Sequence, residues 1–195
     1  MRKLLAGLLF AVPLALPAQD LLVQARAQEV RVKAPEMHFL TGRALDRLKN
    51  GATVIFEIQL SLAVDSKSNA LRRSIERFAV SYDLWEERFA VIGLRQGSKA
   101  VSHLSAQAAE VWCLDQLAVP TSGIAPERPV WLRLEIRAEE SNERIDGDSD
   151  ASVDLARLVE LFSRGGQRRE MRWSAEHGPV RLGSIPSPAG GEKSR

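Results

Sequence analysis

The chain of 195 residues is poor in cysteine and in aromatic residues, with one cysteine and 6% Phe, Trp and Tyr. A single cysteine excludes an internal disulfide, and because Cys113 lies between Trp112 and Leu114 we expect it to be buried as a small hydrophobic side chain. With 45% hydrophobic and 27% charged residues, the chain is too apolar to be a disordered protein. The composition therefore predicts one compact domain that is stabilised by its own core.

The sequence also lacks the short motifs on which common catalytic and cofactor sites are built. It has no Gly-x-Ser-x-Gly elbow and no phosphate-cradling glycine loop, and its three histidines, His38, His103 and His177, do not pair at a metal-ligand spacing. We therefore expect no catalytic residue and no cofactor, and a protein that is not an enzyme.

The first residues follow the order of a secretory signal peptide. Met1–Lys3 is basic, Leu4–Leu16 is apolar, and small and polar residues follow. The apolar run is shorter than the roughly 20 residues of a spanning helix, so we expect no stable membrane anchor after cleavage. We place the signal peptide at residues 1–18, with Ala27 as a second cleavage position. The expected location is the periplasm or the medium.

Removal of the signal changes the charge balance. The net charge is +2 for the whole chain, and Arg2 and Lys3 are its only charged residues before position 19, so the mature chain is neutral. A neutral surface does not attract the phosphates of a nucleic acid, and we expect no nucleic-acid partner.

Alternating apolar and polar residues predict several strands with one wet face, which is the face exposed to solvent. The clearest is residues 54–64, where the apolar positions are Val54, Phe56, Ile58, Leu60, Leu62 and Val64. Further strands are predicted at 30–34, 78–84, 88–94, 130–138, 171–175 and 180–185. The strands at 54–64, 78–84 and 88–94 follow one another closely, which predicts an antiparallel meander.

Helical spacing of apolar residues predicts about three amphipathic helices. They lie at 41–50, at 104–118, and around Leu155, Leu158, Val159 and Phe162. Sequential half-wet strands with helices predict an α+β fold with a mainly antiparallel sheet; the alternative is a small β-sandwich with helical connections. We expect residues 19–28 to lead into a single domain at 29–185, and 186–195 to form a disordered tail.

An acidic stretch is the one segment with the spacing of a metal loop. Its alternating carboxylates make a weak calcium candidate of Asp146, Asp148, Asp150 and Asp154. A calcium loop that starts at Asp146 needs glycine at its sixth position and glutamate at its twelfth, where this chain has Ala151 and Arg157. We therefore interpret the stretch as an acidic turn before the third helix and expect no metal.

Two groups of residues are candidates for a partner surface. One is the basic cluster of Arg164, Arg168, Arg169 and Arg172. The other is Trp85 and Trp131, which fall on the predicted wet faces of their strands. An exposed tryptophan there indicates a contact site, unless a helix or a second sheet covers that face.

Several segments together resemble a family of exported bacterial proteins known as domain of unknown function 4390. They are a helix and glycine at 40–51, the strand at 54–60, the Ser-Tyr-Asp hairpin at 78–83 and the strand at 88–91. The resemblance covers most of the mature chain and implies an envelope protein, but it implies no activity, cofactor or catalytic residue.

These observations predict an exported, non-enzymatic interaction or scaffold module of the bacterial envelope, whose partner is an envelope protein. One alternative is an apolar-ligand or lipid-binding domain, in which the apolar face of 54–64 lines a cavity. The other is a hydrolase whose site is assembled from residues distant in sequence. The sequence does not define the oligomeric state.

Overall fold

The structure of the protein is a computed structural model that describes residues 21–97, 99–139 and 170–187. Within these residues the chain forms nine strands in two antiparallel sheets, together with two α-helices. The α+β architecture with antiparallel sheets is therefore confirmed. The third predicted helix lies outside the described residues.

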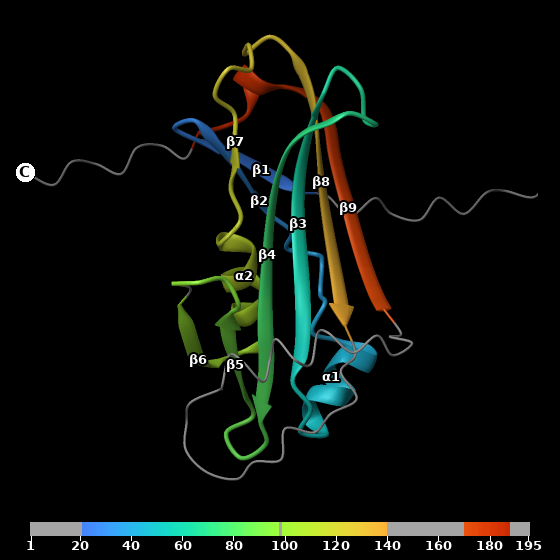
Figure 1. The fold of residues 1–195 in the computed structure, drawn as a ribbon, viewed down its shortest axis with the longest axis vertical. Helices are drawn as coiled ribbons and strands as arrows, with labels where there is room; N and C mark the ends of the chain where they lie inside the picture. The colour runs from blue at the N-terminus through green and yellow to red at the C-terminus, as the bar shows by residue number, and fades with distance from the viewer. Residues whose placement is uncertain (1–20, 98, 140–169, 188–195) are drawn as a thin grey trace, which may run out of the picture.

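Six strands form a long, twisted antiparallel sheet (Figure 1). Its order is β6-β5-β4-β3-β8-β9. The strands are β3 (Val54–Val64), β4 (Ala70–Asp83), β5 (Arg88–Gly93), β6 (Ala100–Leu104), β8 (Pro129–Glu139) and β9 (Glu170–Arg181). The predicted meander is confirmed, because β3, β4 and β5 pair in sequence order, and β6 extends it by one strand.

The central strand β3 carries the core of this sheet. All six apolar positions of its alternating pattern point to one face and are at most 7% exposed. The neighbouring strands add side chains at matching registers, such as Phe78 opposite Phe56 and Leu134 opposite Leu60. Two-residue periodicity thus predicts the buried face of β3 correctly.

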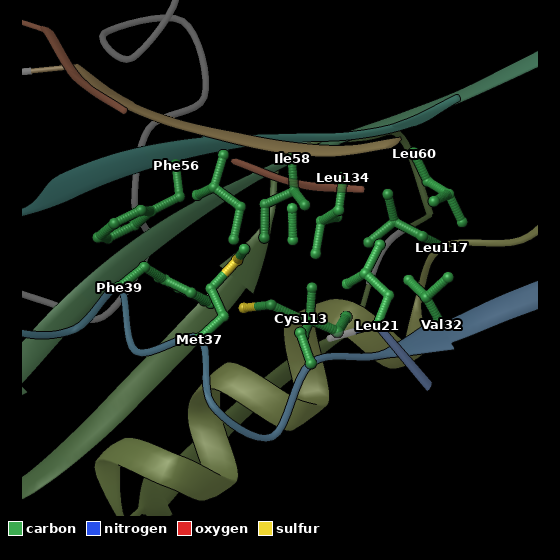
Figure 2. Close-up of a cluster of buried hydrophobic side chains, with 14 of the residues drawn as sticks. Leu21, Val32, Met37, Phe39, Phe56, Ile58, Leu60, Cys113, Leu117 and Leu134 are labelled. Carbon is green, nitrogen blue, oxygen red and sulfur yellow. The ribbon is translucent and has the colours of Figure 1, made fainter. Parts of the chain in front are cut away.

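A second, three-stranded sheet covers part of that face. It is formed by β1 (Leu22–Arg26), β2 (Glu29–Lys33) and β7 (Val119–Pro120). Figure 2 shows Leu21, Val32 and Leu117 from this layer close to Leu60 of β3. Residues 21–28 are therefore part of the folded structure and not a lead-in to it: Leu21 and Val23 are buried, and β1 pairs along its length with β2.

Two helices complete the cover. Helix α1 (Gly42–Lys49) buries Ala44 and Leu48 at one end of the sheet, and helix α2 (Ala106–Asp115) lies beside the small sheet. The hydroxyl of Ser105 accepts a hydrogen bond from the Ala108 N–H and so caps α2. Both helices were predicted from spacing, and both are shorter than the predicted ranges. Neither has the length and apolar character of a membrane-crossing helix.

The remaining differences lie at strand ends. Strand β4 begins at Ala70, ahead of the predicted start at Phe78, because its polar first half pairs with the end of β3. Strand β9 is one strand where two short ones were predicted, and a short 3-10 helix, Leu182–Ser184, follows it. Pro186, at the predicted start of the tail, still accepts a hydrogen bond from the Ala25 N–H of β1.

Candidate interaction site

The tip of the β4–β5 hairpin carries the most exposed large apolar side chains of the described residues. Trp85 is 97% exposed and Leu84 is 57% exposed. Both lie in the turn between Asp83, the last residue of β4, and Arg88, the first residue of β5. In Figure 1 this turn is the green loop at the lower end of the molecule, beyond the end of the sheet.

The side chain of Asp83 holds this turn. Its Oδ1 accepts hydrogen bonds from the backbone N–H groups of Trp85, at 2.8 Å, and of Glu86, at 3.0 Å. The bonds to Glu86 and Trp85, together with the nearby His103, lower the pKa of Asp83 below 3.8. The carboxylate therefore acts as a local cap that orders the segment carrying Trp85.

A second contact connects the turn to β6. The Oε2 atom of Glu86 lies 3.0 Å from Nε2 of His103, and Nδ1 of the same histidine lies 2.8 Å from the hydroxyl oxygen of Ser102. These side chains are exposed, so the contact contributes little stability, but it restricts the position of the turn.

The tip has an acidic surround. Asp83, Glu86 and Glu87 lie within three residues of Trp85, as does one basic residue, Arg88 at the start of β5. The exposed ring is thus presented beside carboxylates. An interaction at this tip would favour a basic surface over an acidic one.

The second tryptophan expected at a wet face, Trp131, does not join this site. It lies on β8, on the face of the sheet opposite the core, and is half-buried. Gly178 packs against it: a Cβ at Gly178 would lie 3.2 Å from the Trp131 Cδ1 atom and 2.6 Å from the Val130 oxygen. Gly178 adopts φ +125°, a backbone conformation that favours glycine, at the bulged end of β9. The close approach of this backbone covers part of Trp131.

The predicted basic cluster and calcium candidates are mostly not part of the described structure. Arg172 lies on β9 and is exposed. Arg164, Arg168, Arg169 and the aspartates at 146, 148, 150 and 154 lie outside the described residues. Within residues 21–139 and 170–187, Ser98 excepted, no three His, Cys, Asp or Glu side chains are grouped as metal ligands.

Sequence reasoning missed a buried carboxylate under the sheet. Glu110 on α2 is 4% exposed, and its two oxygens lie 2.8 Å from the Leu40 backbone nitrogen and 3.0 Å from Nδ1 of His38. It connects α2 to the segment between β2 and α1. Its position one turn before Cys113 and Leu114 was the available signal, because this spacing puts all three on one helix face.

The burial of Cys113 is confirmed, since the side chain is fully enclosed. Figure 2 shows its sulfur pointing toward Met37. Burial, and to a smaller extent the charge of Glu110, raise the pKa of the thiol. The thiol therefore stays protonated and serves as a core side chain rather than a nucleophile.

A pocket of about 180 Å³ lies between α2 and the β5–β6 connection. Trp112 and Phe78 form its apolar wall with their rings 5.9 Å apart, and Arg95 pairs with Glu76 at 2.9 Å on its rim. The pocket is small, and two of its three charged side chains, Arg95 and Glu76, already pair with each other. It offers less to a partner than the exposed hairpin tip.

Comparison of the chain with protein families, with curated proteins and with solved structures gives no match. The resemblance to the domain of unknown function 4390 family therefore stays a prediction.

Proposed function

We propose that this chain is an exported interaction module of the bacterial envelope, without enzymatic activity, that binds a protein partner through the tip of the β4–β5 hairpin. The observation that carries the proposal is Trp85, which is 97% exposed on a turn that Asp83 holds in place.

An exposed, ordered tryptophan is suited to binding. Burial of a tryptophan side chain removes about 150–250 Å² from water, which at about 25 cal/mol per Å² is worth roughly 4–6 kcal/mol before the costs of association. Tryptophan is also enriched among the residues that dominate interface energies. Because the turn is already ordered by Asp83 and Glu86, little conformational entropy is lost when a partner covers it.

The acidic residues of the tip narrow the class of partner. Glu86 and Glu87 directly follow Trp85, so an anionic membrane surface or a nucleic acid would meet like charge there. The chemistry that fits is a protein with an apolar pocket for Trp85 and Leu84 and a basic rim. Such a partner buries the Trp85 ring and pairs with the carboxylates at the same time.

Export is the second part of the proposal, and the fold bears on the cleavage position. Cleavage after Ala18 leaves all of β1 in the mature chain. Cleavage after Ala27 removes β1 together with the buried side chains of Leu21 and Val23. We therefore propose Gln19 as the first mature residue, which the intact mass of the secreted protein would check.

The lipid-binding alternative receives no support from the face on which it depends. In Figure 2 the side chains of Phe56, Ile58 and Leu60 face those of Phe39 and Leu117 from the same chain. The space that an apolar ligand would need is occupied here by core side chains.

Site-specific photocrosslinking tests the proposal. A photoreactive phenylalanine in place of Trp85, expressed in the producing bacterium, should give a discrete protein adduct in the envelope fraction. The same residue in place of Val111, which is 46% exposed on α2, is the matched control. Trp85→Ala should abolish co-purification of the crosslinked protein, whereas Val111→Ala should retain it. Equal labelling from both positions would refute the tip as the binding site.

A further inference from the structure

Strand β9 forms one edge of the six-stranded sheet. Among the described strands it pairs only with β8. Its register with β8 is unbroken from Glu139↔Glu170 to Leu132↔His177 and shifts only beyond that point, near Gly178 and Pro179. A regular segment of eight residues, 170–177, thus has a second edge that can accept a further strand.

The side chains along this edge have a self-complementary order. On the charged face of the sheet, Arg172, Ser174 and Glu176 follow one another and all three are exposed. On the core face, the large Trp173 alternates with the small Ala175. Reversal of the strand about Ser174 exchanges the arginine with the glutamate, and the tryptophan with the alanine.

We propose that β9 pairs antiparallel with β9 of a second copy of this chain, about a two-fold axis beside Ser174, so that the two sheets become one continuous sheet. The core faces of the two copies then lie on the same side. An interface of this kind is isologous, because each copy contributes the same surface.

Charge selects this register over its neighbours. With the axis beside Ser174, Arg172 of each copy lies opposite Glu176 of the other, so two opposite-charge pairs form. An axis beside Arg172 or Glu176 places that residue opposite its own copy, with like charges in contact. An axis beside Trp173 or Ala175 sets Arg172 or Glu176 against Ser174 and forms no charge pair. Among axes beside residues 172–176, only the one beside Ser174 therefore gives attraction at both positions.

The core face favours the same register. Each Trp173 lies opposite the other copy's Ala175, where the small side chain leaves room for the ring. Within one copy Trp173 is half-buried, with its ring 6.4 Å from Phe39 and 6.3 Å from Phe56. The added strand covers the outer edge of this aromatic cluster, so burial of apolar surface contributes to association.

The Arg172–Glu176 pairs between copies do not require side chains that lack contacts within one copy. Glu176 already lies 3.1 Å from Lys67 and 3.6 Å from Arg133, and the partner's arginine would extend this network. Exposed pairs of this kind are individually weak, so they determine the register, whereas backbone hydrogen bonds and the covered tryptophan provide most of the affinity. In Figure 1 the β4–β5 tip lies at one end of the sheet, so the two-fold axis places the two tips at opposite ends of the dimer.

Sedimentation of the mature chain over a range of concentrations tests dimer formation. The wild-type protein should form a dimer that dissociates on dilution. Arg172→Glu alone, or Glu176→Arg alone, places like charges opposite each other twice and should weaken the dimer on the order of tenfold or more. The double swap Arg172→Glu with Glu176→Arg should restore it. Circular dichroism of each variant verifies folding.

Disulfide crosslinking tests the axis independently. Ser174→Cys should give a covalent dimer under mild oxidation, because directly opposite Cβ atoms in antiparallel strands lie within disulfide reach. Ser81→Cys, exposed on the interior strand β4, is the control and should stay monomeric. A wild-type protein that is monomeric at every concentration, or equal crosslinking of both variants, overturns the proposal. Crosslinking of S174C without rescue by the double swap would keep the axis beside Ser174 but overturn the role of the Arg172–Glu176 pairs in selecting it.

Discussion

Phe56 lies on a strand of the six-stranded sheet and Trp85 lies in the turn between two of its strands; the first is fully buried and the second is almost fully exposed. Phe56 lies near the start of β3, with Phe39 at 5.1 Å and Trp173 at 6.3 Å between ring centroids. Trp85 extends from the β4–β5 turn with 97% of its surface in water. The chain thus covers one aromatic with other parts of the fold and presents the other at a tip.

The difference arises from what covers each position and not from the residues themselves. The face that contains Phe56 is covered by the small sheet, α2 and the segment that leads to α1. No described element packs over the turn, and its order comes instead from the Asp83 hydrogen bonds and the Glu86–His103 contact. Burial therefore depends on long-range packing, whereas the exposed tip depends on contacts among residues that lie close to it.

The largest expected effect is at the buried aromatic. Phe56→Asp should prevent folding, because it removes the ring from a closed core and leaves an unpaired charge there, at a cost of more than about 5 kcal/mol. Gln59→Asp, on the opposite face of the same strand, should cost no more than about 1 kcal/mol. The residue is half-buried, and the new carboxylate adds one like-charge pair with Glu135 on the neighbouring strand. Thermal melts followed by circular dichroism would measure both, and equal melts would contradict the assignment of faces.

A smaller effect is expected at the contact that attaches helix α2 to the segment between β2 and α1. Glu110→Ala removes the acceptor of the buried Leu40 N–H, and the unsatisfied group should lower the free energy of unfolding by about 1–3 kcal/mol. Val111→Ala, at an exposed position of the same helix, is the control and should change it by less than about 0.5 kcal/mol. Urea denaturation of both variants would measure the difference. An unchanged midpoint for Glu110→Ala would show that α2 stays attached without this carboxylate.

The smallest effect concerns the order of the tip and depends on pH. Because the folded-state pKa of Asp83 is depressed, its contribution to the order of the turn is fully present above pH 3.8. That contribution is lost as the pH falls through the lower folded-state pKa. The backbone amide signals of Trp85 and Glu86 in nuclear magnetic resonance spectra should therefore titrate with a midpoint below 3.8. Asp83→Asn should abolish this titration without a measurable change in global stability. A midpoint above that value would contradict the hydrogen-bonded turn.

The elements that the sequence predicted well are those with many regularly spaced apolar residues. Strand β3 and helix α1 are of this kind, since each has a clear period and one continuous buried face. Strand β8 was predicted for the same reason, and it pairs with β3 along nearly its whole length.

The elements that were missed are short or polar, and pairing alone defines them. Strand β6 has exposed residues such as Ser102 and His103, and β1 has only Val23 buried within it. The first half of β4 carries Arg72, Arg73 and Ser74, which no alternation marks as a strand. Backbone hydrogen bonds to a neighbouring strand form regardless of side-chain pattern, so a partner distant in sequence determines these segments.

The candidate site shows the same division. The sequence identified Trp85 and Trp131 as equivalent, because each was placed on a predicted wet face. The structure separates them, since Trp85 lies in a turn and Trp131 packs beside Gly178. The buried pair of Glu110 and the Leu40 N–H joins residues 70 positions apart, and no local pattern predicts such a contact.

By itself the sequence determined which side chains of β3 point together, because in an extended backbone successive residues alternate between two faces. It also determined that Cys113 is a core residue. Only the tertiary structure decided which faces are covered and which aromatic is left in water, and it placed β9 at an edge. The physical reason is that orientation is a property of neighbouring residues, whereas burial and strand order depend on segments that meet only when the whole chain has folded.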